Sequence, residues 1–258
     1  MSRAEIAKDL DCRVLGPLQL MVGQQKLKVP AGKNGVLLAI LLVRVGELVS
    51  TEEVIDRLWG DDLPQRPKSA LQTRITRVRH ALDRGRPGLG QVVRSESGGY
   101  EFAVDPSQVD LIRFRQLAQR LPARCAVEES ERLRQALDLV HGRILADVRG
   151  PALEADIIPG LEEELLLARE RRCELEISLG RHRELVSELR GLVGRYTFRE
   201  RFWLQLMTCL YRSDRQTEAL EAYCEIDRRL RQEVGVDPCE ELRTLHARIL
   251  RNTAVQVA

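Results

Sequence analysis

Basic side chains gather in one stretch of the sequence, between Pro64 and Arg86. The stretch holds seven arginines and lysines but a single acidic residue, Asp83. Guanidinium groups and side-chain amides donate hydrogen bonds in fixed directions, which suits phosphate groups and the acceptor-rich edges of nucleic-acid bases. Helix faces that serve solubility alone usually mix both signs of charge, so this local excess indicates an anionic partner.

A helix from about Lys68 to Asp83 would position these groups. An apolar stripe recurs in it at spacings of four, three and four, at Leu71, Ile75, Val78 and Leu82. With that stripe buried, the opposite face is basic and polar, which suits the major groove of DNA because the groove admits an α-helix. We expect the bases to be read by Gln72, Thr73, Arg74 and Arg77. The alternative is that this face is simply solvated.

Further polar residues lie at predicted helix starts, further along the same helix or beside a glycine turn, where they suit contacts to phosphate. These phosphate candidates are Lys33, Thr51, Lys68, Ser69, Arg79, Arg94 and Tyr100.

The preceding elements predict a hairpin and two helices. Arg13–Val22 alternates like a strand, and Gly23-Gln24 turns it into a second strand, Lys26–Val29. Val36–Val45 has the continuous apolar character of a buried helix, ended by Gly46. The next helix starts at Ser50, which forms a predicted capping box with Glu53.

A second hairpin is predicted around Gly98-Gly99, with Tyr100–Val104 as its second strand. Strand, three helices and hairpin is the order of a winged helix. After residue 105 the strand signals disappear, and Trp203, Leu206, Ala219 and Tyr223 fit a tetratricopeptide helix pair.

The predicted fold class is therefore mainly α, with an N-terminal winged helix-turn-helix (α+β, small hairpins) and an all-α tetratricopeptide-like domain. The expected boundaries are a flexible N-terminus at 1–11, a winged-helix domain at 12–105, a helical domain at 106–252 and a flexible tail at 253–258.

Composition and motifs exclude several classes. The longest apolar run, Val36–Val43, is far shorter than the roughly 18 residues of a membrane span, so we expect a cytoplasmic protein. The six cysteines form no CxxC pair and have no histidine at metal-ligand spacing, so we expect free buried thiols, no metal and no cofactor. Without a glycine-rich phosphate loop, GxSxG or HExxH, no enzyme is predicted.

Several segments, in this order and spacing, resemble the Streptomyces antibiotic regulatory protein (SARP) family over nearly the whole length. Those typical of its OmpR-type winged helix are residues 13–18, 37–42, 49–60, 70–79 and 98–100. Those similar to its bacterial transcriptional activation domain are residues 110–115, 179–185, 199–201, 210–213, 218–220 and 233–238. The sequence departs from the family at Asn34-Gly35, where relatives often carry basic residues, and at Val140-His141, where many have tryptophan.

The resemblance implies a transcriptional activator of an antibiotic gene cluster. Such a protein binds tandem direct repeats in double-stranded DNA, usually as two subunits side by side, and recruits RNA polymerase holoenzyme through its sigma factor. It places Arg74 and Arg77 on the recognition helix. Because the sequence shows no receiver domain and no NTPase module, we expect no control by aspartyl phosphorylation or nucleotide within the chain.

A second hypothesis is a tetratricopeptide-like scaffold for a protein or small ligand, with the winged helix used for protein contact. The basic helix distinguishes the scaffold from the DNA-binding activator, because a scaffold needs no face of unpaired arginines. A DNA reader should also lose affinity steeply as salt rises.

Overall fold

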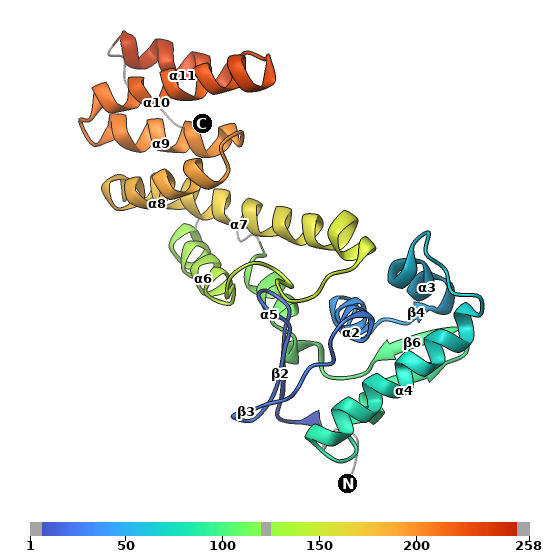
Figure 1. The fold of residues 1–258 in the computed structure, drawn as a ribbon. Helices are drawn as coiled ribbons and strands as arrows, with labels where there is room; N and C mark the ends of the chain where they lie inside the picture. The colour runs from blue at the N-terminus through green and yellow to red at the C-terminus, as the bar shows by residue number, and fades with distance from the viewer. Residues whose placement is uncertain (1–6, 120–124, 252–258) are drawn as a thin grey trace. The chain divides into compact units, whose positions relative to one another are not determined.

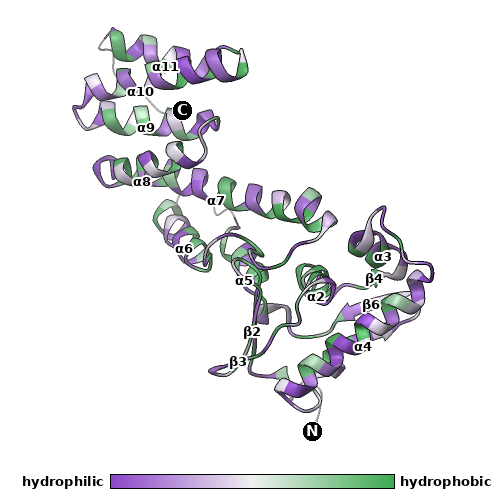
Figure 2. Cartoon of the chain, in the orientation of Figure 1, coloured by the Kyte–Doolittle hydropathy of each residue, from purple (hydrophilic) through white to green (hydrophobic). Residues whose placement is uncertain are grey.

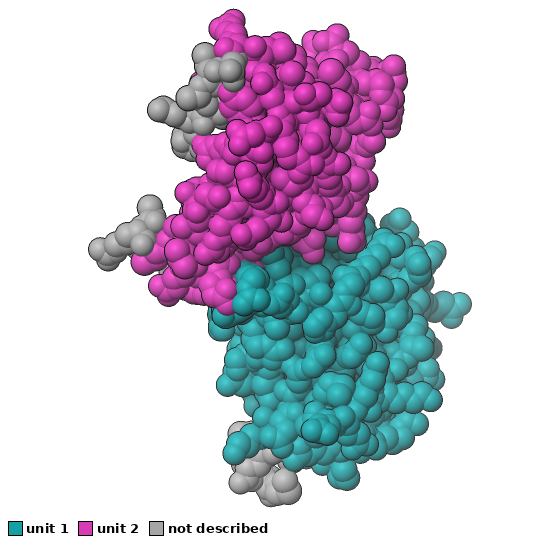
Figure 3. Space-filling view, turned by 90° about the vertical axis from the view of Figure 1, so that its left-hand side faces the viewer, with its two compact units in different colours: residues 1–119, 134–166 teal, residues 120–133, 167–258 magenta. Residues whose placement is uncertain are grey.

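The structure is a computed structural model that describes residues 7–119 and 125–251. The chain divides into two compact units, residues 1–119 with 134–166 and residues 120–133 with 167–258 (Figure 3). The fold is mainly α, as predicted, and the strands of the described residues all lie between Leu10 and Phe102 (Figure 1). The boundary at residues 105–106 stays a prediction.

A small antiparallel sheet opens the first unit. It consists of β1 (Leu10–Arg13), β2 (Gln19–Val22) and β3 (Gln25–Lys26), in that order. The predicted turn at Gly23 is confirmed, with φ at 57°. The single strand expected over Arg13–Val22 is wrong, because residues 14–18 leave the sheet between β1 and β2.

Carboxylates from later in the chain explain that departure. Asp110 is buried and accepts hydrogen bonds from the backbone N–H groups of Val14 (2.9 Å) and Leu15 (3.0 Å). Asp147 accepts from the N–H of Leu18 at 2.7 Å. Burial raises the pKa of Asp110, although these N–H donors oppose the rise. Side chains thus satisfy the amides that a strand would have used, and they join residues 14–18 to the chain beyond residue 105.

Three helices follow, α2 (Lys33–Val43), α3 (Thr51–Trp59) and α4 (Pro67–Gly85). Helix α2 is buried continuously from Gly35 to Leu42 and is almost uniformly hydrophobic in Figure 2, whereas α4 alternates between polar and apolar turns. This contrast agrees with the predicted buried helix and the predicted amphipathic helix.

Helix α3 begins with half of the predicted capping box. The Ser50 hydroxyl accepts from the N–H of Glu53 at 3.1 Å, but the Glu53 carboxylate pairs with Arg57 (3.0 Å) and Arg44 (3.3 Å). We attribute this to the guanidinium groups, which are stronger partners for a carboxylate than the backbone N–H of Ser50.

The second sheet combines β4 (Val49–Ser50) with the hairpin β5 (Val93–Glu96) and β6 (Gly99–Phe102), in the order β4-β6-β5; the 3₁₀ turn η1 (Leu89–Val92) precedes β5. Gly98 turns the hairpin at φ 91°. A Cβ at Gly99 would lie 2.3 Å from the Val49 carbonyl oxygen, so only glycine allows β4 and β6 to approach this closely. The hairpin is the wing of a winged helix-turn-helix.

The remaining elements are helical. They are η2 (Pro106–Gln108), α5 (Asp110–Leu117), α6 (Ala126–Asp138), η4 (Leu153–Ile157), α7 (Ile158–Ser178), α8 (His182–Arg195), α9 (Glu200–Arg212), α10 (Gln216–Arg229), η5 (Leu230–Val234) and α11 (Glu240–Leu250). Helix α9 packs against α8, α10 and α11. Trp203, Leu206 and Ala219 are buried and Tyr223 stacks on His246 at 3.8 Å, which agrees with core packing of a tetratricopeptide-like pair.

No helix within residues 7–119 and 125–251 is long and apolar enough to cross a membrane. Cys12, Cys173 and Cys209 are buried free thiols, but Cys224 and Cys239 are exposed, so the expectation of buried thiols is wrong for these two.

Candidate nucleic-acid interface

The apolar stripe of α4 fixes which side of the helix faces outward. Its members, Leu71, Ile75, Val78 and Leu82, are each at most 2% exposed. Burial of one such side chain stabilises by roughly 1.5–3 kcal/mol, so four of them hold the rotation of the helix firmly. Pro67 begins the helix at a position where its missing N–H costs nothing. The opposite, polar face is therefore held towards solvent.

Three of the four base-reading candidates reach that surface. Gln72, Thr73 and Arg77 are exposed, and Arg77 makes no hydrogen bond or ion pair with any described residue. Arg74 differs, because it is half-buried and its Nη1 donates to Asn34 Oδ1 at 3.3 Å. The structure thus leaves Arg77 free on the outward face and ties Arg74 to the start of α2.

Thr76, His80 and Arg84 share the outward face and were not among the predicted site residues. All three are exposed. Helical spacing could have found them, because they lie three or seven residues from Thr73 or Arg77.

The candidates at the helix starts lie near one another. Lys68 and Ser69 are exposed on the first turn of α4, and Lys68 Nζ lies 3.6 Å from Glu52 Oε1 on α3. Both members of this pair are more than 70% exposed, so it holds Lys68 only weakly. The backbone N–H of Thr51 donates to the Gly98 carbonyl at 2.9 Å, which places the start of α3 beside the wing turn.

Two other basic candidates hold the fold together. Lys33 Nζ donates to the Leu58 carbonyl at 3.2 Å and lies 5.6 Å from the centre of the Trp59 ring. Arg79 donates to the Val93 carbonyl at 2.9 Å and to Ser95 Oγ at 2.8 Å. Lys33 therefore joins α2 to the end of α3, while Arg79 fixes the wing against α4.

The last two candidates, Arg94 and Tyr100, lie on the wing strands. Arg94 Nη1 is 3.8 Å from Glu101 Oε2, and its Nε is buried without a hydrogen-bond partner. Tyr100 is only 8% exposed, so its ring belongs mostly to the core and does not join the surface group. The exposed part of the wing is its tip, at residues 95–98.

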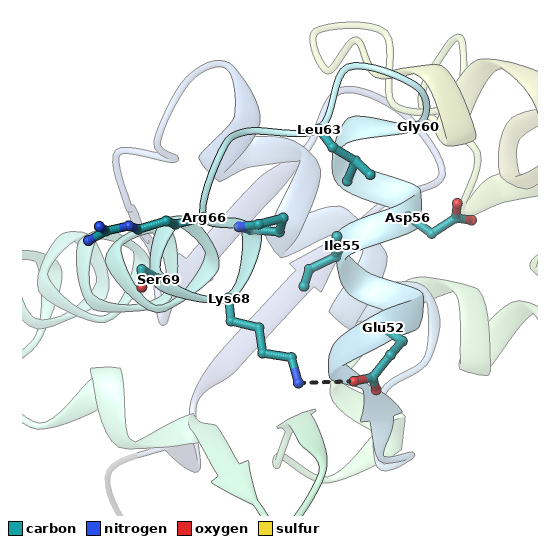
Figure 4. Close-up of a pocket in the computed structure, with 9 residues that line it drawn as sticks. Glu52, Ile55, Asp56, Gly60, Leu63, Arg66, Lys68 and Ser69 are labelled. Atoms are coloured by element: carbon teal, nitrogen blue, oxygen red, sulfur yellow. Dashed lines mark ion pairs between the residues drawn. The ribbon is translucent and has the colours of Figure 1, made fainter.

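An open pocket of about 500 Å³ lies between α3 and the start of α4 (Figure 4). Ile55 and Leu63 point into it, and the Glu52–Lys68 pair lies at its edge. Arg66 extends away from α3, and Asp56 points outward on the other side. The apolar interior separates the exposed Asp56 from the basic start of α4.

Positive charge on α4 has little local compensation. The helix has no acid in its first turn, and its one acid, Asp83, accepts from the Gly90 N–H at 2.7 Å. A rigid helix with free donors, flanked by a wing, can insert into the DNA major groove and hold its phosphates.

Comparison with known proteins identifies relatives over almost the whole chain. Residues 109–250 match the bacterial transcriptional activator domain family. The chain is 35% identical to the regulatory protein DnrI of Streptomyces peucetius, over 94% of this chain and 92% of DnrI. It is 38% identical to the regulatory protein AfsR of Streptomyces coelicolor over 92% of this chain, but spans only 24% of AfsR.

A solved structure shows the same fold. Mycobacterium tuberculosis EmbR, in complex with a low-affinity phosphopeptide, superposes with a TM-score of 0.84 at 28% identity. The match covers 96% of this chain and 66% of the EmbR chain.

Proposed function

The chain belongs to the SARP family of transcriptional regulators, and from that premise we propose that it activates transcription by binding DNA in a sequence-specific manner. Its sites are tandem direct repeats in promoters of a secondary-metabolite (antibiotic) gene cluster. It recruits RNA polymerase holoenzyme through the sigma factor and acts in the cytoplasm, where the chromosome lies. No catalytic step is part of this role.

The observation that carries the proposal is the free, outward face of α4. Arg77 can donate two hydrogen bonds to guanine, and Gln72 or Thr73 can contact neighbouring bases. Arg74 can read a base only if its hydrogen bond to Asn34 opens, so we assign it a smaller part of the binding free energy than Arg77. Lys68 and Ser69 contact phosphates and set the register.

The shape of one reading unit supports a definite spacing for the proposed direct repeats. The described residues present a single basic helix with a single wing, which reads one half-site from one side of the duplex. Two subunits that bind the same face of DNA need half-sites about one helical turn apart, roughly 10 to 10.5 base pairs. We therefore propose a homodimer at least on DNA.

A gel-shift titration against promoter fragments tests the proposal. Wild-type protein and the Arg74→Ala/Arg77→Ala variant are compared at two salt concentrations. Arg228→Ala, which removes an exposed arginine from α10, is the matched control. We expect tight, salt-sensitive binding that the double variant loses and the control keeps.

Spacing provides the second arm of this test. Insertion of about half a helical turn between the two repeats should abolish paired binding, because it moves one half-site to the opposite face. Unchanged binding would refute side-by-side docking. Absence of binding to every fragment would favour the tetratricopeptide-like scaffold instead.

A further inference from the structure

We infer that the C-terminal half of α4 and the chain around the start of α2 form a groove for one phosphodiester strand of DNA. This inference rests on the proposed function and adds a contact to it. The groove has a volume of about 580 Å³. It is lined by Pro30, Asn34, Arg77, His80, Ala81, Asp83 and Arg84.

The width of the major groove brings a DNA backbone to each side of an inserted helix. An α-helix with its side chains is about 10–12 Å across and the groove is about 12 Å wide, so an inserted helix has a sugar-phosphate backbone on each side. On one side α4 is bound to the wing through Arg79 and Ser95. On the other side it is bound to α2 through Arg74 and Asn34.

The cationic side chains near the start of α2 differ in whether the fold already uses them. On the α2 side the predicted phosphate contact was Lys33, but this side chain is bonded to Leu58 and lies against Trp59. His80 and Arg84, by contrast, are exposed and make no hydrogen bond or ion pair with any described residue. They are therefore available to a ligand at no cost to the fold.

Hydrogen-bond donors outnumber acids along this groove. His80 follows Arg77 by three residues and Arg84 follows it by seven, so the three donors lie along one side of the helix. The groove contains one acid, Asp83, whose carboxylate accepts a hydrogen bond from the Gly90 N–H. In this arrangement Arg77 reaches the bases, while His80 and Arg84, one helical turn apart, contact neighbouring phosphates of one strand.

The test measures binding of the full chain to an operator duplex and to a random duplex by fluorescence anisotropy. Arg84→Ala should weaken both complexes by a similar factor, because phosphate contacts carry no sequence information. Loss of one contact lowers the salt slope by about 0.9, so the affinity loss between 50 and 200 mM salt should shrink about 3.5-fold. Arg84→Lys should restore the slope, and Arg228→Ala should leave it unchanged.

Neutral methylphosphonate groups, placed singly along the operator, then locate the contact. Wild-type protein should be sensitive to substitutions on both strands that border the major groove. Arg84→Ala and His80→Ala should each lose sensitivity at adjacent positions of one strand only. Overturning results are a wild-type salt slope in Arg84→Ala, sensitivity at every position in both variants, or a loss confined to the operator duplex. Failure of the wild-type chain to bind either duplex would instead reject the proposed function.

Discussion

Arginines on the helices of the second unit and on the outward face of α4 have opposite surroundings. Several in the second unit are paired: Arg171 bonds Glu129 at 2.7 Å, and Arg201 bonds Glu241 at 3.2 Å and also Glu174. On the outward face of α4, Arg77 and Arg84 have no partner among the described residues. The same residue type therefore joins helices in one place and is free for a ligand in another.

The difference teaches how to interpret basic residues along a helix. A paired arginine lowers the free energy of the folded state, and its removal should appear in unfolding. An exposed, unpaired arginine contributes almost nothing to folding, and its removal should appear in binding. Unfolding of each unit can be followed by its own tryptophan, because Trp59 lies in the first unit and Trp203 in the second.

The largest expected effect is on the free energy of unfolding, when a paired arginine of the second unit is removed. Arg171→Ala removes the guanidinium that donates to the carboxylate of Glu129, which is 1% exposed. We expect the free energy of unfolding to fall by about 3 kcal/mol, since a buried carboxylate is then left with less compensation for its charge. Urea unfolding followed by Trp203 fluorescence in a Trp59→Phe background measures it. A change below about 0.5 kcal/mol would contradict the assignment of this pair as structural.

The matching change on the outward face of α4 is Arg77→Ala, which removes an unpaired arginine. We expect a loss of roughly 1–3 kcal/mol on the specific DNA site and much less on random DNA, because a base contact is lost. The free energy of unfolding should change by less than about 0.5 kcal/mol. Equal losses on both duplexes would make Arg77 a phosphate contact and weaken its distinction from Arg84.

A backbone change in the second unit gives a smaller effect. Asp214 follows α9 with φ at 62°, a left-handed conformation that glycine adopts without a steric penalty. Asp214→Gly should stabilise the second unit by about 0.5–1 kcal/mol and leave DNA affinity unchanged. Urea unfolding followed by Trp203 in the Trp59→Phe background checks the first part and anisotropy the second. A destabilised variant would show that the Asp214 side chain contributes more than the strain costs.

The smallest effect is the pH dependence of the exposed pairs. Hydrogen bonds from Arg215 lower the pKa of Glu218, and those from Arg228 lower the pKa of Glu225. Because both folded-state pKa values lie below the unfolded value of 4.5, their stabilisation is complete above that pH and is lost as pH falls through the folded values.

Unfolding followed by Trp203 should accordingly become easier in this acid range. The Glu218→Gln/Glu225→Gln variant should show a shallower dependence on pH. An identical acid profile in the variant would show that these surface pairs do not contribute to stability.

The sequence by itself determined the elements that depend on local pattern. The stripe from Leu71 to Leu82 specified an amphipathic helix, Gly98-Gly99 specified the wing turn, and Ser50 specified the start of α3, because spacing, glycine conformation and capping act within a few residues. The family also followed from the sequence, since its segments occur in order along the chain.

Only the tertiary structure decided which polar groups are free. Arg74, Arg77 and Arg79 are close in sequence, yet Asn34 holds the first, the wing holds the third, and Arg77 alone of the three remains open. Likewise, residues 14–18 leave the sheet because Asp110 and Asp147 bind their amides. These partners lie from 14 to 129 residues away, so pattern within a short window cannot reveal them; folding brings them together.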